Sequence, residues 1–300
     1  MAATQGGRTR HVGRHGGAPV SEAVLYDAAG PRGRRRILIG SIAGALLVVL
    51  AVGAAVARLA AKGAFEAERW RVLTQSDLQR LLGRGLAATL RAALVAMVLA
   101  MAVGGLLAVA RLSRRRWLSM PAGAWVELFR GLPLLLLILF IFLGLPAAGV
   151  TVSTFWALVA GLTLYNSAVL GEIFRAGILS LPKGQTEAAY SIGLRRGQTL
   201  RLILIPQAVR RMLPALISQL VTLLKDTSLG FVIAYAELLR TGRNAVEFLG
   251  GPYSIPVYTA IAVIYIAVNA SLSFLARWLD RRTQRRYGRT VQPSVADEAA

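Results

Sequence analysis

The chain has 300 residues, 55% of them hydrophobic, and its mean hydropathy of +0.56 is too high for an ordinary soluble domain. It has no cysteine, which excludes disulfides and cysteine-ligated metals, and its only histidines, His11 and His15, lie in a polar tail. None of its three lysines follows a glycine, so it contains no P-loop for ATP hydrolysis. The formal charge of +21 comes from basic residues beside apolar runs, a pattern typical of membrane topology rather than of nucleic-acid binding.

The N-terminal part is predicted to be a basic, disordered tail over residues 1–36, followed by an apolar run over 37–57. That run is long enough to span a bilayer. Residues 55–57 (Ala-Val-Ala) are similar to a signal-peptidase site, but the run is longer than a typical signal-peptide core and its leader is too long. An uncleaved helix is therefore predicted. Segment 58–85 is predicted to be external or interfacial.

Five further apolar runs predict an all-α, polytopic transmembrane bundle with six spans. They lie at 87–110, 126–145, 154–173, 213–236 and 257–277. The segments that then face inward hold most of the 35 Lys and Arg residues. This bias predicts that both termini are cytoplasmic.

Polar residues mark the third and fourth spans. Glu127 and Arg130 stand three residues apart on one helical face, which predicts an interfacial ion pair. Asn166 and Ser167 could hydrogen-bond a polar ligand on a translocation pathway, or simply join neighbouring helices. The residues predicted to be structural in this region are Glu127, Arg130, Pro133, Glu172 and Arg175.

A polar segment with regular spacing separates the fourth and fifth spans. A helix is predicted over 185–192, a bend at Gly193 and an amphipathic continuation from Gln198. Glycine suits the bend because it accepts a positive φ without strain. Two short helices at an angle would form a rigid lever that can transmit a displacement, whereas a flexible loop could not. The alternative is an amphipathic loop that lies on the membrane surface without a partner.

A charged stretch, Lys225-Asp226-Thr227-Ser228, interrupts the fifth span. If Pro214 is the first helical position, Lys225 lies about 16–17 Å along the helix. In a hydrocarbon core about 30 Å thick that is near the midplane, where charges are expensive and face a bundle interior or a water-filled path. A translocation pathway is therefore predicted here. A Lys–Asp pair that locks helix packing is the alternative. The predicted pathway residues are Asn166, Ser167, Lys225, Asp226, Thr227 and Ser228.

The segment 184–206 resembles the EAA loop of permease subunits in bacterial ABC importers, which docks into a groove of the ATPase subunit. It has Glu-Ala-Ala at 187–189, Gly193, and Ile-Leu-Ile-Pro at 203–206. One position departs from the pattern, since Ile205 stands where that family usually has leucine. By this resemblance, coupling to an ATPase would use Glu187, Ala188, Ala189, Gly193, Arg195, Arg196 and Pro206.

Three further motifs extend the resemblance over about residues 85–280. Residues 125–135 read WVELFRGLPLL, similar to the YxElfRGxPLL motif of polar amino-acid permeases. Residues 171–178 (GEIFRAGI) and 224–229 (LKDTSL) are similar to two other motifs of the same branch. That branch is the histidine, glutamate, glutamine, arginine and opine group of ABC-importer permeases.

This resemblance implies a five-span permease core over 86–280, with 37–57 as an extra helix and 281–300 as a cytoplasmic tail. The chain would lie in a bacterial cytoplasmic membrane and would itself bind no cofactor or metal. It implies three partners: an ABC ATPase dimer that binds ATP and Mg²⁺, a second permease subunit (a heterodimer is favoured), and an external solute-binding protein. The favoured substrates are glutamate-like or glutamine-like amino acids.

Three other classes of protein remain as alternatives. An ion-coupled secondary transporter would show inverted repeats and usually a proton-relay carboxylate. An intramembrane enzyme would need the Lys225 and Asp226 pair, because no cysteine or buried histidine is present. A scaffold or receptor subunit would show no flux. ATP-dependent uptake separates all three from an importer.

Overall fold

The computed structural model describes residues 30–287 and is helical, with no strand in that range. The chain forms two compact units, Met1–Lys62 and Gly63–Ala300. In the first unit, α1 (Pro31–Ala61) has none of its residues buried. It begins at Pro31 rather than at Ile37, because proline suits the first turn of a helix, so the basic residues 32–36 are helical and not part of a tail. The tail predicted over 1–29 lies outside the described residues.

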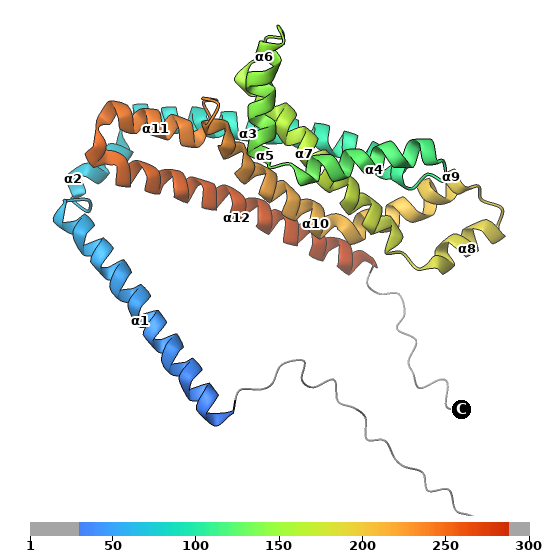
Figure 1. Cartoon of the computed structure of the whole chain (residues 1–300), viewed down its shortest axis with the longest axis horizontal. Coiled ribbons are helices and arrows are strands. Elements are labelled where there is room, and N and C mark those ends of the chain that lie inside the picture. The colour runs from blue at the N-terminus through green and yellow to red at the C-terminus, as the bar shows by residue number, and fades with distance from the viewer. Residues whose placement is uncertain (1–29, 288–300) are drawn as a thin grey trace, which may run out of the picture. The chain divides into compact units, whose positions relative to one another are not determined.

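The second unit contains the remaining helices (Figure 1). They are α2 (Ala67–Trp70), α3 (Ser76–Arg111), α4 (Arg116–Gly131), α5 (Leu134–Leu139), α6 (Leu145–Ala147), α7 (Thr154–Leu179), α8 (Lys183–Ser191), α9 (Arg196–Gln198), α10 (Ile205–Asp226), α11 (Leu238–Leu249) and α12 (Ser254–Tyr287). Short 3₁₀ segments cover Arg71–Thr74, Thr227–Phe231 and Gly251–Tyr253, and π-helical segments cover Phe140–Gly144 and Thr199–Leu204.

The predicted number of six spans is not established by the described helices. Four of them, α1, α3, α7 and α12, are long and apolar enough to cross a membrane. The number rises to five if the bent pair formed by α4 and the segment Leu134–Ala147 is counted as one span. The pair is bent by 101°. The bend follows from Pro133, because the residue before a proline is pushed out of the helical region and Leu132 is extended (φ −88°, ψ 137°).

The fifth predicted span ends earlier than its apolar run. The run continues to residue 236, but α10 ends at Asp226 and a 3₁₀ segment and a turn follow. In that turn Ala234 has a φ of 58°, which is uncommon for a residue other than glycine. The correction places the polar stretch from Lys225 to Ser228 at the end of a helix rather than inside one.

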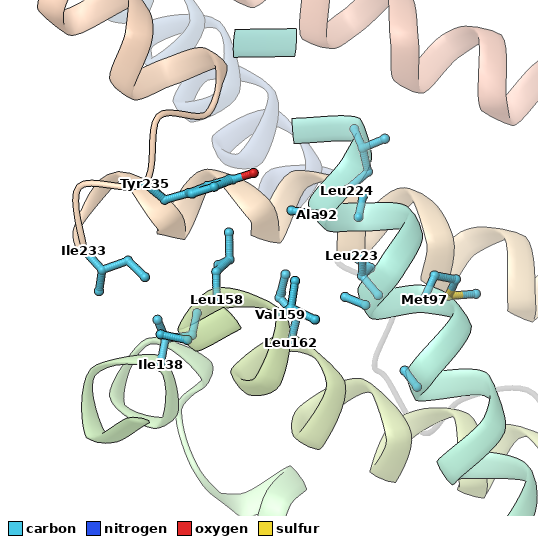
Figure 2. Packing of buried hydrophobic residues seen from close by; sticks show 14 of the residues in the cluster. Ala92, Met97, Ile138, Leu158, Val159, Leu162, Leu223, Leu224, Ile233 and Tyr235 are labelled. Atoms are coloured by element: carbon cyan, nitrogen blue, oxygen red, sulfur yellow. The ribbon is translucent and has the colours of Figure 1, made fainter. Parts of the chain in front are cut away.

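The core of the second unit forms where α3 and α7 approach closely. Small residues make this possible: a Cβ atom at Gly104 of α3 would lie 2.9 Å from the carbonyl oxygen of Ser167 on α7. Figure 2 shows buried side chains of this core, which come from several helices. They include Ile138, Leu158, Leu162, Leu223 and Tyr235. These contacts hold α10, and with it the candidate site, against the bundle.

Candidate functional site

The segment between α7 and α10 is built from two short helices that meet at an angle (Figure 1). The first, α8, ends at Ser191, and Gly193 follows two residues later with a φ of +82°. The backbone N–H of Gly193 donates to the carbonyl of Tyr190 (2.9 Å), and that of Leu194 donates to Ala189 (3.1 Å). These bonds close the helix end, and the left-handed glycine turns the chain toward α9. The predicted bend is confirmed.

Hydrogen bonds and apolar contacts fix this segment to the bundle. Arg211 of α10 donates to the carbonyl of Ser180 (2.7 Å), and Gln207 of α10 donates to the side chain of Gln185 on α8 (3.2 Å). Beneath them, Leu181 packs with Ala208 and Met212 in a small buried cluster. These contacts join α8 and the end of α7 to α10.

The outward face of the segment carries most of the residues predicted to couple to an ATPase. Glu187, Ala188, Gly193, Arg195, Arg196 and Pro206 are exposed. Ala189 is buried (4% exposed) and anchors α8, so it does not lie on this face. Two exposed apolar side chains, Tyr190 (44%) and Ile192 (75%), were not singled out by the sequence, although they follow the Glu-Ala-Ala motif closely.

A charge cluster lies at the same end of the bundle. Glu172 of α7 accepts from the guanidinium groups of Arg111 on α3 and of Arg175 on its own helix. Glu172 and Arg175 were predicted to be structural, whereas Arg111 was missed. The ion pair predicted between Glu127 and Arg130 does not form in the described chain, where both residues are exposed.

Three of the predicted pathway residues lie between helices instead. Asn166 is fully buried, accepts from Gln219 of α10 (2.7 Å) and donates to the carbonyl of Leu162 (2.8 Å). Ser167 and Thr227 are also fully buried; the Ser167 hydroxyl donates to the carbonyl of Leu164 on α7, and the Thr227 hydroxyl donates to that of Leu224 on α10. Their burial favours the alternative role in helix packing over a role on the pathway.

An open groove between α10 and α12 is lined by two of the other predicted residues, Lys225 and Ser228. It has a volume of about 710 Å³, and its polar lining residues include Lys225, Ser228 and Asn269. A second groove of about 400 Å³ shares Lys225 and Ser273 with the first and is also lined by Arg277.

Lys225 itself is exposed, and no ion pair joins it to Asp226 in the described chain. Within residues 30–287, no three acidic or histidine side chains gather closely enough to hold a metal ion.

Residues 96–285 match the family described as the binding-protein-dependent transport system inner membrane component. This match covers more than half of the chain. The chain belongs to that family. It is a membrane-embedded permease component of the ABC-importer type, and as such it is a transport subunit rather than an enzyme.

Two curated permease proteins are similar in sequence to this chain. The probable glutamine ABC transporter permease protein GlnP of Bacillus subtilis is 42% identical over 200 residues, which is 66% of this chain and 91% of the relative. The glutamate transport system permease protein GluD of Corynebacterium glutamicum is 38% identical over 242 residues, which is 79% of this chain and 87% of the relative. These relatives give no support to an ion-coupled transporter.

A solved structure of an amino acid ABC transporter with histidines has a TM-score of 0.66 to the permease. It is 31% identical and covers 70% of this chain and 97% of its own. The inward-facing methionine ABC transporter MetNI, at 21% identity and a TM-score of 0.58, shares the fold. The matched region begins at residue 96, so α1 of the permease lies before it in the sequence.

The permease also contains a buried carboxylate that the sequence did not reveal. Glu237 is fully buried and accepts from the backbone N–H groups of Leu239 and Arg240 (both 2.7 Å) and from the Tyr265 hydroxyl (3.0 Å). Beside it, the hydroxyl of Thr89 accepts from the N–H of Leu238 (3.1 Å). These bonds fix the start of α11 against α3 and α12. The sequence signal that could have revealed this site is the position of Glu237 directly before α11, where an acidic residue can cap a helix.

Proposed function

We propose that this chain is the membrane-spanning subunit of an importer for polar amino acids, with glutamine or glutamate favoured, driven by a separate ATPase. One observation carries the coupling: the rigid segment α8–α9 presents exposed Tyr190, Ile192 and Arg195 while it is bonded to α10 from behind. A partner that pushes on this face would move α10 directly. The names of the relatives support the substrate class.

The proposed assembly contains three kinds of partner. An ATPase dimer, which binds ATP and Mg²⁺, docks on the α8–α9 face. A second permease subunit, for which a paralogue is favoured over a second copy, completes the pathway, and an external solute-binding protein delivers the amino acid. With the Lys and Arg bias described above, both termini lie in the cytoplasm and α8–α9 faces the ATPase.

In the proposed mechanism, ATP closes the ATPase dimer and brings the two coupling segments together. The spans then open outward to accept the amino acid, and hydrolysis returns them to the inward state. The ATPase and the loaded binding protein therefore bias a two-state element. Lys225 is proposed to line the pathway, because it is exposed in the groove between α10 and α12 and has no ion pair with Asp226.

The test is a mild-detergent pull-down of the tagged chain from its native membranes, with mass spectrometry of the proteins that co-purify. We expect an ABC ATPase and a second permease. In Ile192→Glu, recovery of the ATPase should fall because a charge enters an apolar contact. The matched control is Phe248→Glu on α11, which changes a side chain that is 90% exposed and lies outside α8–α9.

If no ATPase is recovered while a control importer stays intact, the coupling proposal fails. Equal recovery from the parent chain and Ile192→Glu would show that α8–α9 is not the docking face.

A further inference from the structure

The turn between α3 and α4 carries an unneutralised cluster of positive charge. Arg114, Arg115 and Arg116 are consecutive and exposed. None of their guanidinium groups forms an ion pair or hydrogen bond within the described residues. Directly after them, Trp117 and Met120 of α4 are 67% and 68% exposed and stand three residues apart on one helical face. A cationic group thus lies beside an apolar surface.

The position of this turn relative to a bilayer follows from α3. Leu94, Val98 and Val109 are more than half exposed and recur on one face of this candidate span. The span ends at Arg111, so the turn lies where the chain leaves the hydrocarbon. Exposed tryptophan and arginine favour this interface, because the ring remains partly in the apolar layer and the guanidinium reaches the headgroups.

We propose that residues Arg114 to Trp117 form a binding site for the headgroup of an anionic phospholipid. Guanidinium groups bind phosphate oxygens through paired hydrogen bonds, and three adjacent arginines add charge attraction that a zwitterionic lipid does not satisfy. A protein partner would account for the charge but not for the apolar Trp117 and Met120 beside a span. This proposal rests on the proposed function in one respect only, which is the assignment of the α3–α4 turn to the cytoplasmic side of the membrane.

The occupied site would also bear on the coupling segment. The guanidinium of Arg196, on α9, donates to the carbonyl of Leu112 in the α3–α4 turn. Figure 1 shows α9 and the start of α4 at the same end of the bundle. A lipid that immobilises the turn therefore immobilises a support of α9. Anionic lipid at this site would raise the efficiency of coupling without touching the substrate.

The test measures binding of labelled phosphatidylglycerol to the full purified chain in nanodiscs of phosphatidylcholine. Each arginine is expected to contribute about fivefold in affinity, so R114Q/R115Q/R116Q should lose roughly a hundredfold. The matched control is R34Q/R35Q/R36Q, which removes the same charge from α1. It should lose less than threefold at this site. W117A should weaken phosphatidylglycerol and phosphatidylcholine binding alike, whereas the arginine variant should spare phosphatidylcholine.

Equal losses in the two triple variants would show general attraction between a basic chain and an anionic surface, and would overturn the site. Unchanged binding in R114Q/R115Q/R116Q would also overturn the lipid site. The three arginines would then be assigned to contact with a protein partner. If the triple variant does not insert, the three single replacements serve instead, each with an expected loss of about fivefold. The assay contains neither ATPase nor substrate, so its failure is distinguishable from failure of the import proposal.

Discussion

Glu172 of α7 and Arg111 of α3 form an ion pair across the two helices that make up the centre of the bundle. Their side chains are 22% and 21% exposed, so the pair is partly protected from solvent. Arg175 binds the other carboxylate oxygen. The contact joins α3 to α7 next to the coupling segment, at the end of the bundle where the two helices would otherwise separate.

Replacing Glu172 by glutamine should lower the free energy of unfolding by about 1–3 kcal/mol, because two guanidinium groups lose a charged acceptor. The shift in unfolding midpoint in detergent measures it. The matched control is Glu247→Gln, which breaks the pair with Arg243 on α11, where the side chains are 58% and 45% exposed. That change should cost no more than about 0.5 kcal/mol. Equal effects would show that the α3–α7 pair has no special role.

Gly193 should tolerate only residues that accept its backbone conformation. An added Cβ would meet no atom within 4 Å, so the cost of Gly193→Ala is conformational, about 1–2 kcal/mol at a φ of +82°. We expect Ala and Trp at this position to reduce uptake while the protein still inserts, and Trp to abolish it. Asn should retain more uptake than Ala because it enters the left-handed region more readily.

Gly197→Ala is the control for this series, since the residue lies in α9 with open space and no positive φ. Normal uptake by Gly193→Trp would contradict the hypothesis that α8–α9 acts as a rigid lever.

Two adjacent glycines of α3 should respond in opposite ways to alanine. At Gly104 the new Cβ would lie 2.9 Å from a backbone oxygen of α7 and 3.1 Å from the nitrogen of Gly171, neither of which can move cheaply. We expect a loss of about 1–3 kcal/mol. At Gly105 nothing lies within 4 Å, so alanine should be neutral or slightly stabilising. Unfolding in detergent compares the two. Similar values would contradict the close helix contact.

Lys225 should matter for transport and not for stability. Because it is exposed and lacks an ion pair, Lys225→Gln should change the unfolding free energy by no more than about 0.5 kcal/mol. Uptake in reconstituted vesicles should fall at least about tenfold, in the range expected when a charged contact is lost. Lys225→Arg should restore much of it. If Lys225→Gln unfolds more easily than the parent chain but transports normally, Lys225 has a role in helix packing instead.

Much of this fold could be read from the sequence because its determinants are local. Apolar runs predicted the helices, and the bend at Gly193 followed from the conformational range of glycine. The break at Pro133 had a local signal too, but the apolar run on both sides of it predicted one continuous span. The early end of α10 had a signal in the polar stretch from Lys225, which the same run obscured.

The candidate site was less predictable because burial depends on distant contacts. Ala189 belongs to the coupling motif, yet whether it faces a partner or the bundle is decided by the packing beneath α8. Asn166 faces Gln219, which is 53 residues away in the chain. Glu237 receives its hydroxyl donor from Tyr265 on another helix. No spacing within one helix contains this information.

The buried cap of α11 has a consequence for how a substrate is held. The N-terminus of a helix carries a partial positive charge, and in many transporters an interrupted helix turns this end toward the carboxylate of its substrate. In this chain the carboxylate of Glu237 already occupies that end of α11. On the proposed pathway the N-terminus of α11 would therefore not bind a substrate carboxylate, and Lys225, which lines the groove between α10 and α12, would supply the positive charge instead.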